Sequence, residues 1–389
     1  MKNKIEIFLF IDALGWELVQ AEHFLEKELP ERKKMRMQFG YSCSAIPTIL
    51  SGKTPSEHGH LSLFRYEPKH SPFKFFKLLH YIMLPRSLWN RGRVRNVLSR
   101  MVKKLYGYTG YFQLYRVPFD RIGMMDYCEK RDLFAADGIA PFENLYDVLK
   151  KSGLSFHISN WRKSEGENLA EGLRLVREEK CDFLFLYTAA LDSLEHDCVG
   201  KPEILREKLA FYETKIRELL AEGKLHARDF RLTVISDHGM TPLSGTVDLR
   251  KSLEQTGLKF GRDYAACYDS TMLRVHFLKP ESEAIIKDAV LPFANCGHWL
   301  TEQEERSFDI WREDRLFGDA FFLLNPGIQI IPSDMGGTPL AGMHGFDPAD
   351  KDSNAAMLSN VSIPEDVNAV ADYFRLMKSR IDELSGDMK

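Results

Sequence analysis

The sequence predicts an α/β protein, a three-layer α/β/α sandwich with a mostly parallel central sheet and inserted cap regions. Two observations predict it. Short, almost wholly apolar runs alternate with segments whose apolar residues recur at helical spacing. Polar residues stand directly after the apolar runs. This alternation is typical of parallel strands joined by helices that cover both faces of one sheet.

The first predicted strand covers residues 5–11 and is followed by Asp12. The same pattern of an apolar run with a polar end recurs at 154–160, 183–187 and 232–237. Strands buried on both faces read as continuous apolar runs, so all four are expected in the interior. Ligands of such sheets bind beyond the carboxyl ends of the strands, where Asp12, Asn160 and Asp237 fall.

Helical patterns connect the predicted strands, and an amphipathic segment that we expect to pack on the sheet closes the chain. These helices are expected around 142–152, 165–179, 203–222 and 364–384. Two regions break the alternation and are interpreted as insertions: a basic, aromatic cap at 61–140 and a second insertion at 262–340, with short strands and a helix near 282–292. The catalytic core is then expected to comprise 1–60, 141–261 and 341–389.

Composition and charge exclude several classes of protein. The 389 residues are 44% hydrophobic and 28% charged with a net charge of -3, which is ordinary for a soluble globular protein and gives no general attraction to a nucleic-acid polymer. The six cysteines form no CxxC pair, so we expect neither a zinc ribbon nor a disulfide framework. Asp12 interrupts the only early apolar run, so no signal peptide is expected and the predicted location is the cytoplasm.

Six Asp and His side chains stand at a strand end, on a helical pattern or in a Gly-flanked turn, where side chains can project into a cleft. They are Asp12, Asp192, His196, Asp237, His238 and His344. Adjacent Asp and His residues after a strand can reach one cation, and an Asp and a His one helical turn apart share a face. Each signal also has a structural explanation, because such residues are often helix caps, turn formers or solvated surface groups.

A candidate nucleophile lies in the segment 40–59, between Asp12 and the next strand. A small hydroxyl residue at the start of a helix can present its oxygen to a metal, while its backbone N–H groups face a phosphate. Both Ser42 and Ser44 fit this description, and an N-cap role is the structural alternative for either.

The order of these motifs resembles the alkaline phosphatase superfamily, and within it the type I phosphodiesterase/nucleotide pyrophosphatase family. That family has a Ser or Thr nucleophile ten residues ahead of the Gly in a TG-x-x-P-x-x-HG segment, which matches 51–59 and selects Ser42. Its D-x-x-x-H, DHG and G-x-HG elements match residues 192–196, 237–239 and 342–345 in the same order. The resemblance implies one metal held by Asp192, His196 and His344, and a second held by Asp12, Asp237, His238 and the Ser42 oxygen.

The resemblance implies a metal-dependent phosphoester hydrolase, most similar to a phosphodiesterase/nucleotide pyrophosphatase, with two divalent ions: zinc, or manganese as the alternative. Ser42 is expected to attack phosphorus and form a phosphoserine-type intermediate that water then hydrolyses. Asn160 is expected either to hydrogen-bond a phosphoryl oxygen or to cap a turn. This chain departs from the family in having Ser in place of the usual Thr, and 43–47 lacks the usual Pro-Asn pair.

Alternative functions remain open at this point. A phosphomonoesterase or a phosphoryl-group transferase of the same superfamily would use the same ligands. A sulfatase is disfavoured because its nucleophile precedes x-Pro-x-Arg, and the segment after Ser42 has neither the Pro nor the Arg at those positions. A catalytically silent binding module would keep the fold and lose the reaction.

The segment 74–116 bears on the substrate, because it contains many cations and no Asp or Glu. Its basic residues are Lys74, Lys77, Arg86, Arg91, Arg93, Arg95, Arg100, Lys103, Lys104 and Arg116, and its last part holds Tyr106, Tyr108, Tyr111, Phe112 and Tyr115. Such a segment suits a small anionic phosphoester, nucleotide-like or linked to a lipid or sugar, or peripheral contact with an anionic membrane. A solvated basic helix is the structural alternative.

Overall fold

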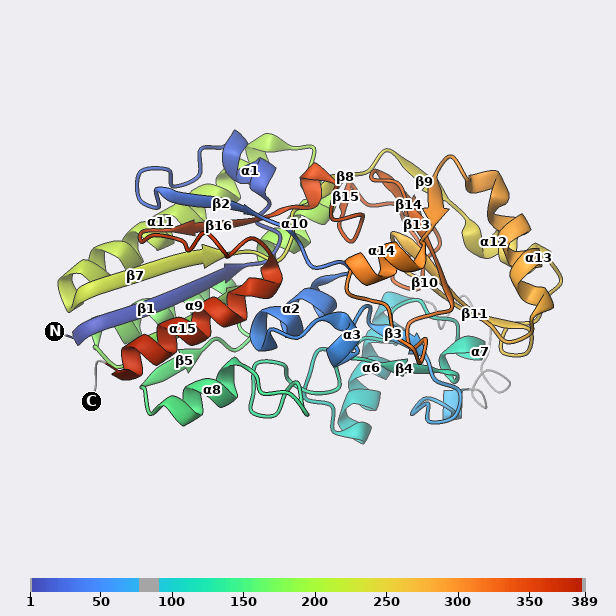
Figure 1. Ribbon diagram of the computed structural model, residues 1–389, viewed down its shortest axis with the longest axis horizontal. Helices are drawn as coiled ribbons and strands as arrows, with labels where there is room; N and C mark the ends of the chain where they lie inside the picture. Colours follow the sequence, from blue (N-terminus) through green and yellow to red (C-terminus); the bar gives the residue numbers. More distant parts are fainter. Residues whose placement is uncertain (1, 77–90, 387–389) are drawn as a thin grey trace.

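A six-stranded sheet forms the left part of the molecule in Figure 1. The computed structural model describes residues 2–76 and 91–386. Four parallel strands confirm the four predicted ones, namely β1 (Lys2–Ile11), β5 (Phe156–Ile158), β6 (Phe183–Thr188) and β7 (Ala227–Ile235). Two strands were not predicted, β16 (Ala355–Ser359) and β2 (Glu31–Met35), and they extend the sheet beyond β7 in the order β2-β16-β7-β1-β6-β5. The predicted mostly parallel α/β fold is confirmed.

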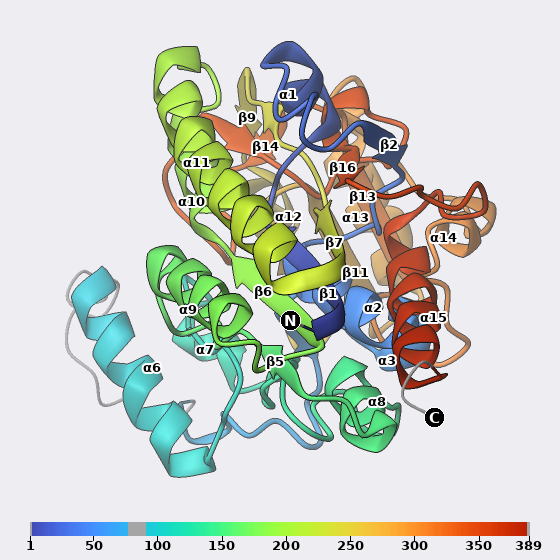
Figure 2. The same cartoon turned by 90° about the vertical axis from the view of Figure 1, so that its left-hand side faces the viewer.

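Helices cover both faces of this sheet, so the predicted three layers are present (Figure 2). Side chains alternate along a strand, and Ile7 and Leu9 of β1 face one layer while Phe8 and Phe10 face the other. The first layer contains α1 (Trp16–Ala21), α9 (Glu165–Arg177) and α11 (Pro202–His226). The second layer contains α2 (Ser42–Ser51), α8 (Leu145–Ser152) and α15 (Tyr373–Gly386).

The closing helix packs on the sheet as expected but begins later than the predicted residue 364. The chain before it is extended, because Val370 N donates to the carbonyl of Arg36 at 3.0 Å and Arg36 N donates to the carbonyl of Asn368 at 3.0 Å. The Asp372 carboxylate then accepts from the backbone N–H of Ala369 at 3.0 Å and caps the turn that leads into α15. These contacts join the segment to the edge of the sheet, and its apolar residues are buried there.

A second, antiparallel sheet lies beside the first, at the right of Figure 1. Its strands follow the order β10 (Tyr264–Tyr268), β11 (Met272–Phe277), β13 (Ala320–Leu324) and β12 (Gly297–Trp299), and α12 (Leu249–Gln255) and α13 (Glu281–Val290) pack against it. The 61–140 region contributes a separate pair, β3 (Phe64–Tyr66) and β4 (Met125–Tyr127), and the helix α6 (Gly92–Tyr106). Described parts of both predicted insertions therefore lie outside the six-stranded sheet.

The other described helices and strands are short. They are α3 (Pro55–His58), α7 (Phe119–Ile122), α10 (Ala190–Cys198), α14 (Glu302–Ser307), β8 (Thr241–Pro242), β9 (Gly245–Val247), β14 (Ile328–Ile330) and β15 (Gly342–Met343). Turns of 3-10 helix lie at Leu291–Phe293, Lys351–Ser353 and Val370–Asp372. Among the helices of residues 2–76 and 91–386, none is long and apolar enough to cross a membrane.

Candidate metal centre

The candidate ligands meet beyond the carboxyl ends of three neighbouring strands. Asp12 follows β1, Asp237 and His238 follow β7, and Asp192 lies on α10, which begins directly after β6. Because β7, β1 and β6 are adjacent and parallel, their ends lie at the same edge of the sheet. His344 joins them from the turn after β15. Two groups of three result: Asp192, His196 and His344, and Asp12, Asp237 and His238.

In the first group, two imidazoles converge on one carboxylate. The Nε2 atoms of His196 and His344 each lie 3.5 Å from Asp192 Oδ1. His196 Nδ1 lies 3.0 Å from the carbonyl oxygen of Gly342, which makes Nδ1 the donating nitrogen. The Nε2 lone pair of His196 is therefore directed at the same point as the carboxylate oxygen, which is the arrangement a divalent cation requires.

The second group is fully buried and has the same design. His238 Nε2 lies 3.2 Å from Asp237 Oδ2 and 3.6 Å from Asp12 Oδ1. Its Nδ1 lies 3.0 Å from the carbonyl oxygen of Gly239, so Nε2 again carries the lone pair. The rings of His238 and His344 stack with 3.7 Å between their centroids, so the two groups lie side by side.

The carboxylates of the two groups are short of positive charge. Burial and the charges of Asp237 and Asp192 raise the pKa of Asp12 well above its usual range, and burial likewise raises the pKa of Asp237. Burial and the neighbouring imidazoles hold the pKa of His344 well below its usual range, so this ring is neutral. Three buried oxygens have no hydrogen-bond partner among the described residues: Asp12 Oδ1, Asp192 Oδ1 and Asp237 Oδ2. The neutral imidazole of His344 and the unpaired carboxylate oxygens fit bound divalent cations.

Ser42 is the first residue of α2, and its Oγ lies 3.2 Å from His238 Nε2. The preceding Tyr41 is extended and accepts at its carbonyl oxygen from the backbone N–H groups of Ser44 and Ala45, which starts the helix at this point. Ser44, the alternative nucleophile, is buried, and its hydroxyl donates to the carbonyl of Phe39 at 2.9 Å. Of these two serines, the structure brings only Ser42 to the ligand groups.

The 51–59 motif supports this helix. Gly52 has a φ of 66°, a left-handed conformation that favours glycine, and it ends α2. Thr54 and Glu57 then cap α3 reciprocally. At the end of α3, His58 Nε2 lies 3.1 Å from the hydroxyl of Thr48 on α2. The motif that selected Ser42 in the sequence therefore fixes the helix that presents it.

The second sheet also positions the site. The Tyr41 hydroxyl lies 2.8 Å from the hydroxyl of Thr271, which in turn donates to the carbonyl of Gly345 at 2.7 Å. The backbone N–H of Thr271 donates to the same tyrosine oxygen at 3.1 Å. Thr271 thus joins the start of the nucleophile helix to the turn that carries His344.

The structure does not bring Asn160 to this centre. Its side chain is exposed and accepts a hydrogen bond from the backbone N–H of Arg162 at 3.0 Å. Asn160 also does not line the cavity over Ser42. Of the two roles considered for it, this hydrogen bond corresponds to the turn cap.

A cavity of about 630 Å³ opens over Ser42 and the ligand groups. The aromatic part of the 74–116 segment reaches it through Tyr111 and Tyr115, whereas none of its described basic residues lines it. Arg95 is buried instead, with its guanidinium on the carbonyl of Val117, and Lys77 and Arg86 lie outside the described residues. The described part of the segment therefore contributes aromatic rings rather than cations to the cavity wall.

Two cavity residues were missed in the sequence. Tyr187 is the last residue but one of β6, and its hydroxyl donates to Asp12 Oδ2 at 2.8 Å. The parallel pairing of Phe10 with Tyr187 gives the signal for it, because residues in register at strand ends share an edge. Glu129 follows β4 and lines the cavity, and nothing in its local sequence marks it.

Comparison with known proteins agrees with this geometry. The family model of type I phosphodiesterase / nucleotide pyrophosphatase matches residues 7–347. Murine ectonucleotide pyrophosphatase/phosphodiesterase 5 is similar in structure, with a TM-score of 0.66 at 13% identity over 97% of this chain and 95% of that chain. An inactive variant of the murine protein in complex with AMP has a TM-score of 0.66 at 12% identity, covering 98% and 95% of the two chains.

The human protein of the same name has a TM-score of 0.65 at 12% identity, covering 97% and 95% of the two chains. Among curated proteins, none matches this chain by sequence. The similar structures support the alkaline phosphatase-like fold, and the family model spans nearly the whole chain. The chain therefore belongs to the type I phosphodiesterase/nucleotide pyrophosphatase family and is a phosphodiesterase-like phosphoric ester hydrolase.

Proposed function

We propose that this protein hydrolyses small phosphodiesters with Ser42 as the nucleophile and two divalent cations as cofactors. The observation that carries the proposal is the convergence of two Asp/His groups, whose rings of His238 and His344 stack on each other. Ser42 Oγ lies 3.2 Å from His238 Nε2. Three unpaired buried carboxylate oxygens in these groups support the binding of cations.

Asp192, His196 and His344 would hold one cation, and Asp12, Asp237 and His238 the other, with Ser42 Oγ beside the second group. The bound cations would lower the pKa of the serine hydroxyl and neutralise the charge on the phosphate and the leaving oxygen. One Asp and two His, or two Asp and one His, are donor sets that suit zinc, and manganese is the alternative.

Ser42 Oγ attacks phosphorus, a bond between the serine oxygen and phosphorus forms, and the ester bond to the leaving alcohol breaks. The proton that the serine hydroxyl loses is taken up by the departing alcohol. Water then cleaves the phosphoserine and restores the hydroxyl. Ser42 is the first residue of α2, and the N–H groups of Ser42 and Cys43 have no backbone acceptor within the described residues, so these two groups can donate to phosphoryl oxygens.

The test is a comparison of 4-nitrophenyl esters with the purified protein, with zinc and manganese added separately. We expect the fastest release of nitrophenolate from an alkyl phosphodiester, a slower release from the monoester and none from the sulfate. Faster monoester cleavage would favour a phosphomonoesterase. Retained metal without hydrolysis of any phosphoester would instead favour a catalytically silent binding module.

We also propose that α6 rests on an anionic membrane surface. Its apolar residues Val97, Met101 and Leu105 recur every four positions and are 48%, 62% and 73% exposed. The exposed cations Arg93, Arg100 and Lys104 lie on the same helix, and no ion pair involves them within the described residues. An exposed apolar stripe beside basic side chains matches the chemistry of an anionic lipid surface.

Co-sedimentation with vesicles tests this contact. Vesicles that contain phosphatidylserine should bind the protein more than neutral phosphatidylcholine vesicles, and Leu105→Asp should reduce that binding. Leu225→Asp is the matched control, because Leu225 is 69% exposed on a different helix, α11. Equal binding to both vesicles would contradict the proposal.

We infer a reducing location, the cytoplasm, for the protein. The support is that all six cysteines are free thiols, of which Cys43, Cys181 and Cys267 are buried. If the protein accumulates a disulfide-linked species during isolation without reductant, and that species is fully active, this inference is contradicted.

A further inference from the structure

Glu129 is a buried carboxyl in the wall of the active-site cavity. It follows β4, and the loop that carries it is fixed on both sides. Cys128 N donates to the carbonyl of Leu63 at 2.9 Å, and the carbonyl of Lys130 accepts from the N–H of Thr109 at 3.0 Å. The residue is only 8% exposed, so its position is set by the packed chain rather than by solvent.

This carboxyl has no partner within residues 2–76 and 91–386. No hydrogen bond or ion pair involves its side chain there, although nearby cations are engaged elsewhere. Lys130 pairs with Asp126 at 2.6 Å, and Arg131 donates to the carbonyl of Asp137 at 3.2 Å. Burial alone raises the pKa of Glu129 to about 8, with no neighbouring cation to lower it. A buried carboxyl without a partner costs free energy of folding. Such groups are usual at sites where a bound ligand supplies the missing partner.

Aromatic side chains line the same cavity wall as the carboxyl. Burial raises the pKa values of Tyr111, Tyr115 and Tyr127, and the charge of Glu129 adds to each rise. The hydroxyls of Tyr111 and Tyr115 lie 2.6 Å from each other. Both of these tyrosines line the same cavity as Glu129. A carboxylate beside aromatic faces is the combination that binds organic ammonium groups.

The same carboxyl shares its cavity with the reacting centre. Ser42, Cys43 and Asp192 line this cavity together with Glu129 and Tyr111. A group attached to a phosphate at Ser42 therefore has Glu129 within the same cavity.

We propose that Glu129, with Tyr111 and Tyr115, forms a subsite for a positively charged amine on the organic group of the phosphodiester substrate. The proposal rests on the proposed function and names its substrate class. An amine supplies the charge and the hydrogen-bond donors that the carboxyl lacks. Glu129 does not group with other ligand residues in the described chain, so a third metal does not account for it.

Two matched esters test the subsite. In 2-aminoethyl 4-nitrophenyl phosphate and propyl 4-nitrophenyl phosphate the leaving group is identical, so their kcat/KM ratio reports recognition of the amine. The metal-loaded wild-type protein should prefer the aminoethyl ester by about 10-fold or more. Glu129→Gln should reduce the ratio to about 1 by raising KM for the aminoethyl ester. Glu143→Gln is the control, because Glu143 is an exposed carboxylate paired with Lys151, and it should keep the preference.

The outcomes separate the subsite from the function. Equal kcat/KM values in the wild type, or a preference that survives Glu129→Gln, would overturn the subsite and leave the hydrolase intact. Loss of both reactions with metal bound would overturn the proposed function itself. If Glu129→Gln does not fold, inhibition of the wild type by 2-aminoethyl phosphate and by propyl phosphate decides the question. Tighter inhibition by the amine is expected, and equal inhibition would contradict the subsite.

Discussion

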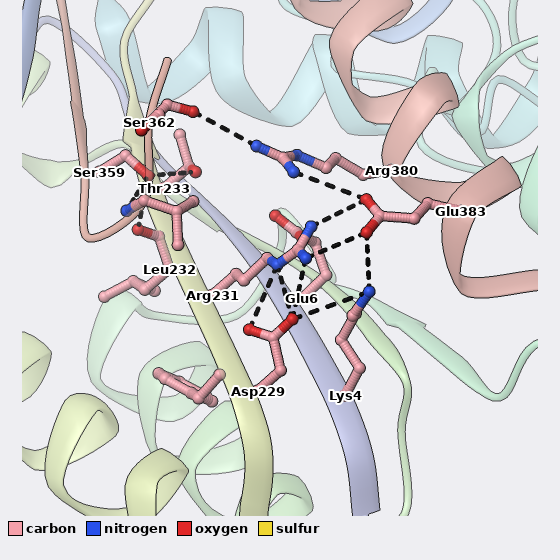
Figure 3. A network of polar contacts seen from close by, with 12 residues as sticks. Lys4, Glu6, Asp229, Arg231, Leu232, Thr233, Ser359, Ser362, Arg380 and Glu383 are labelled. Atoms are coloured by element: carbon pink, nitrogen blue, oxygen red, sulfur yellow. Dashed lines mark hydrogen bonds and ion pairs between the residues drawn. The ribbon is translucent and has the colours of Figure 1, made fainter. Parts of the chain in front are cut away.

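Strands β1 and β7 carry clusters of charged side chains at both ends, and the two clusters are balanced differently. At the start of the strands, Lys4, Asp229, Arg231 and Glu383 form a closed network (Figure 3). Arg231 donates to Glu383 at 2.8 Å and to Asp229 at 3.0 Å, and Lys4 donates to Glu383 at 2.8 Å. The negative charges here are compensated by the chain's own Lys and Arg residues.

At the other end of the same strands, the negative charges have only imidazoles beside them. No Lys or Arg in the described chain pairs with Asp12, Asp192 or Asp237. Negative charge at one end of the sheet is therefore balanced within the fold, whereas negative charge at the other end requires added cations. The first end should therefore govern stability, and the second should govern turnover.

The largest expected effect lies at the metal end. Ser42→Ala should lower kcat for a phosphodiester by at least about 10⁴-fold, because it removes the hydroxyl that lies 3.2 Å from His238 and is expected to form the covalent intermediate. The measurement is steady-state release of 4-nitrophenolate at saturating metal. Metal content should stay unchanged, since the two Asp/His groups are intact.

Ser193→Ala is the control for this change. Ser193 also lines the cavity and is exposed, so loss of its hydroxyl should alter kcat by less than about 10-fold. Unimpaired turnover by Ser42→Ala would remove the serine from the mechanism.

The next effect is a pH dependence of stability at the network end, caused by Glu6. Burial raises the pKa of Glu6 to about 8, although Arg380 and Arg231 lower it and Glu383 and Asp229 raise it further. Between pH 4.5 and 8 the folded state therefore holds a proton that the unfolded state has lost. Stability from this group falls by about 3 kcal/mol as pH rises from 5 to 8.

Glu6→Gln should remove that slope, because glutamine does not titrate. Urea denaturation of both proteins at pH 5 and pH 8 measures this slope. The free energy of unfolding of the variant should rise relative to that of the wild type as pH rises. A wild-type protein that becomes more stable relative to Glu6→Gln over this range would contradict the assignment.

A smaller effect is expected from breaking the network itself. Arg231→Ala leaves Asp229 and Glu383 without their main partner and should cost about 2 kcal/mol of unfolding free energy. Because the network is remote from Ser42, kcat should remain within about twofold of the wild type. A large fall in kcat with unchanged stability would mean that the two ends are not independent.

The sequence predicted the metal end well for a physical reason. Parallel strands bring their carboxyl ends to one edge, so Asp12 and Asp237 were predicted to meet once the strands were identified. The spacing of Asp192 and His196 predicted that these two side chains share one face of a helix. The choice of Ser42 over Ser44 and the assignment of His344 came from the family resemblance rather than from periodicity.

Other features depend on contacts between distant segments and had no local signal. The edge strand β2 has the mostly charged sequence ERKKM and is defined by its pairing with β16, and the short strand β16 is defined by its pairing with β2 and β7. Arg95 lies on a basic helix but is buried because its guanidinium reaches the carbonyl of Val117 and lies 4.0 Å from the Phe119 ring. Glu129 enters the cavity only because its loop pairs with residues far along the chain.

The division between a self-balanced end and a cation-requiring end is tested most directly by the metal content of the purified protein. After dialysis against metal-free buffer, mass spectrometry should find about two divalent ions per chain in the wild type and in Arg231→Ala, and fewer in Asp237→Ala. Wild-type protein that holds no divalent ion and still hydrolyses a phosphodiester in excess chelator would contradict the account.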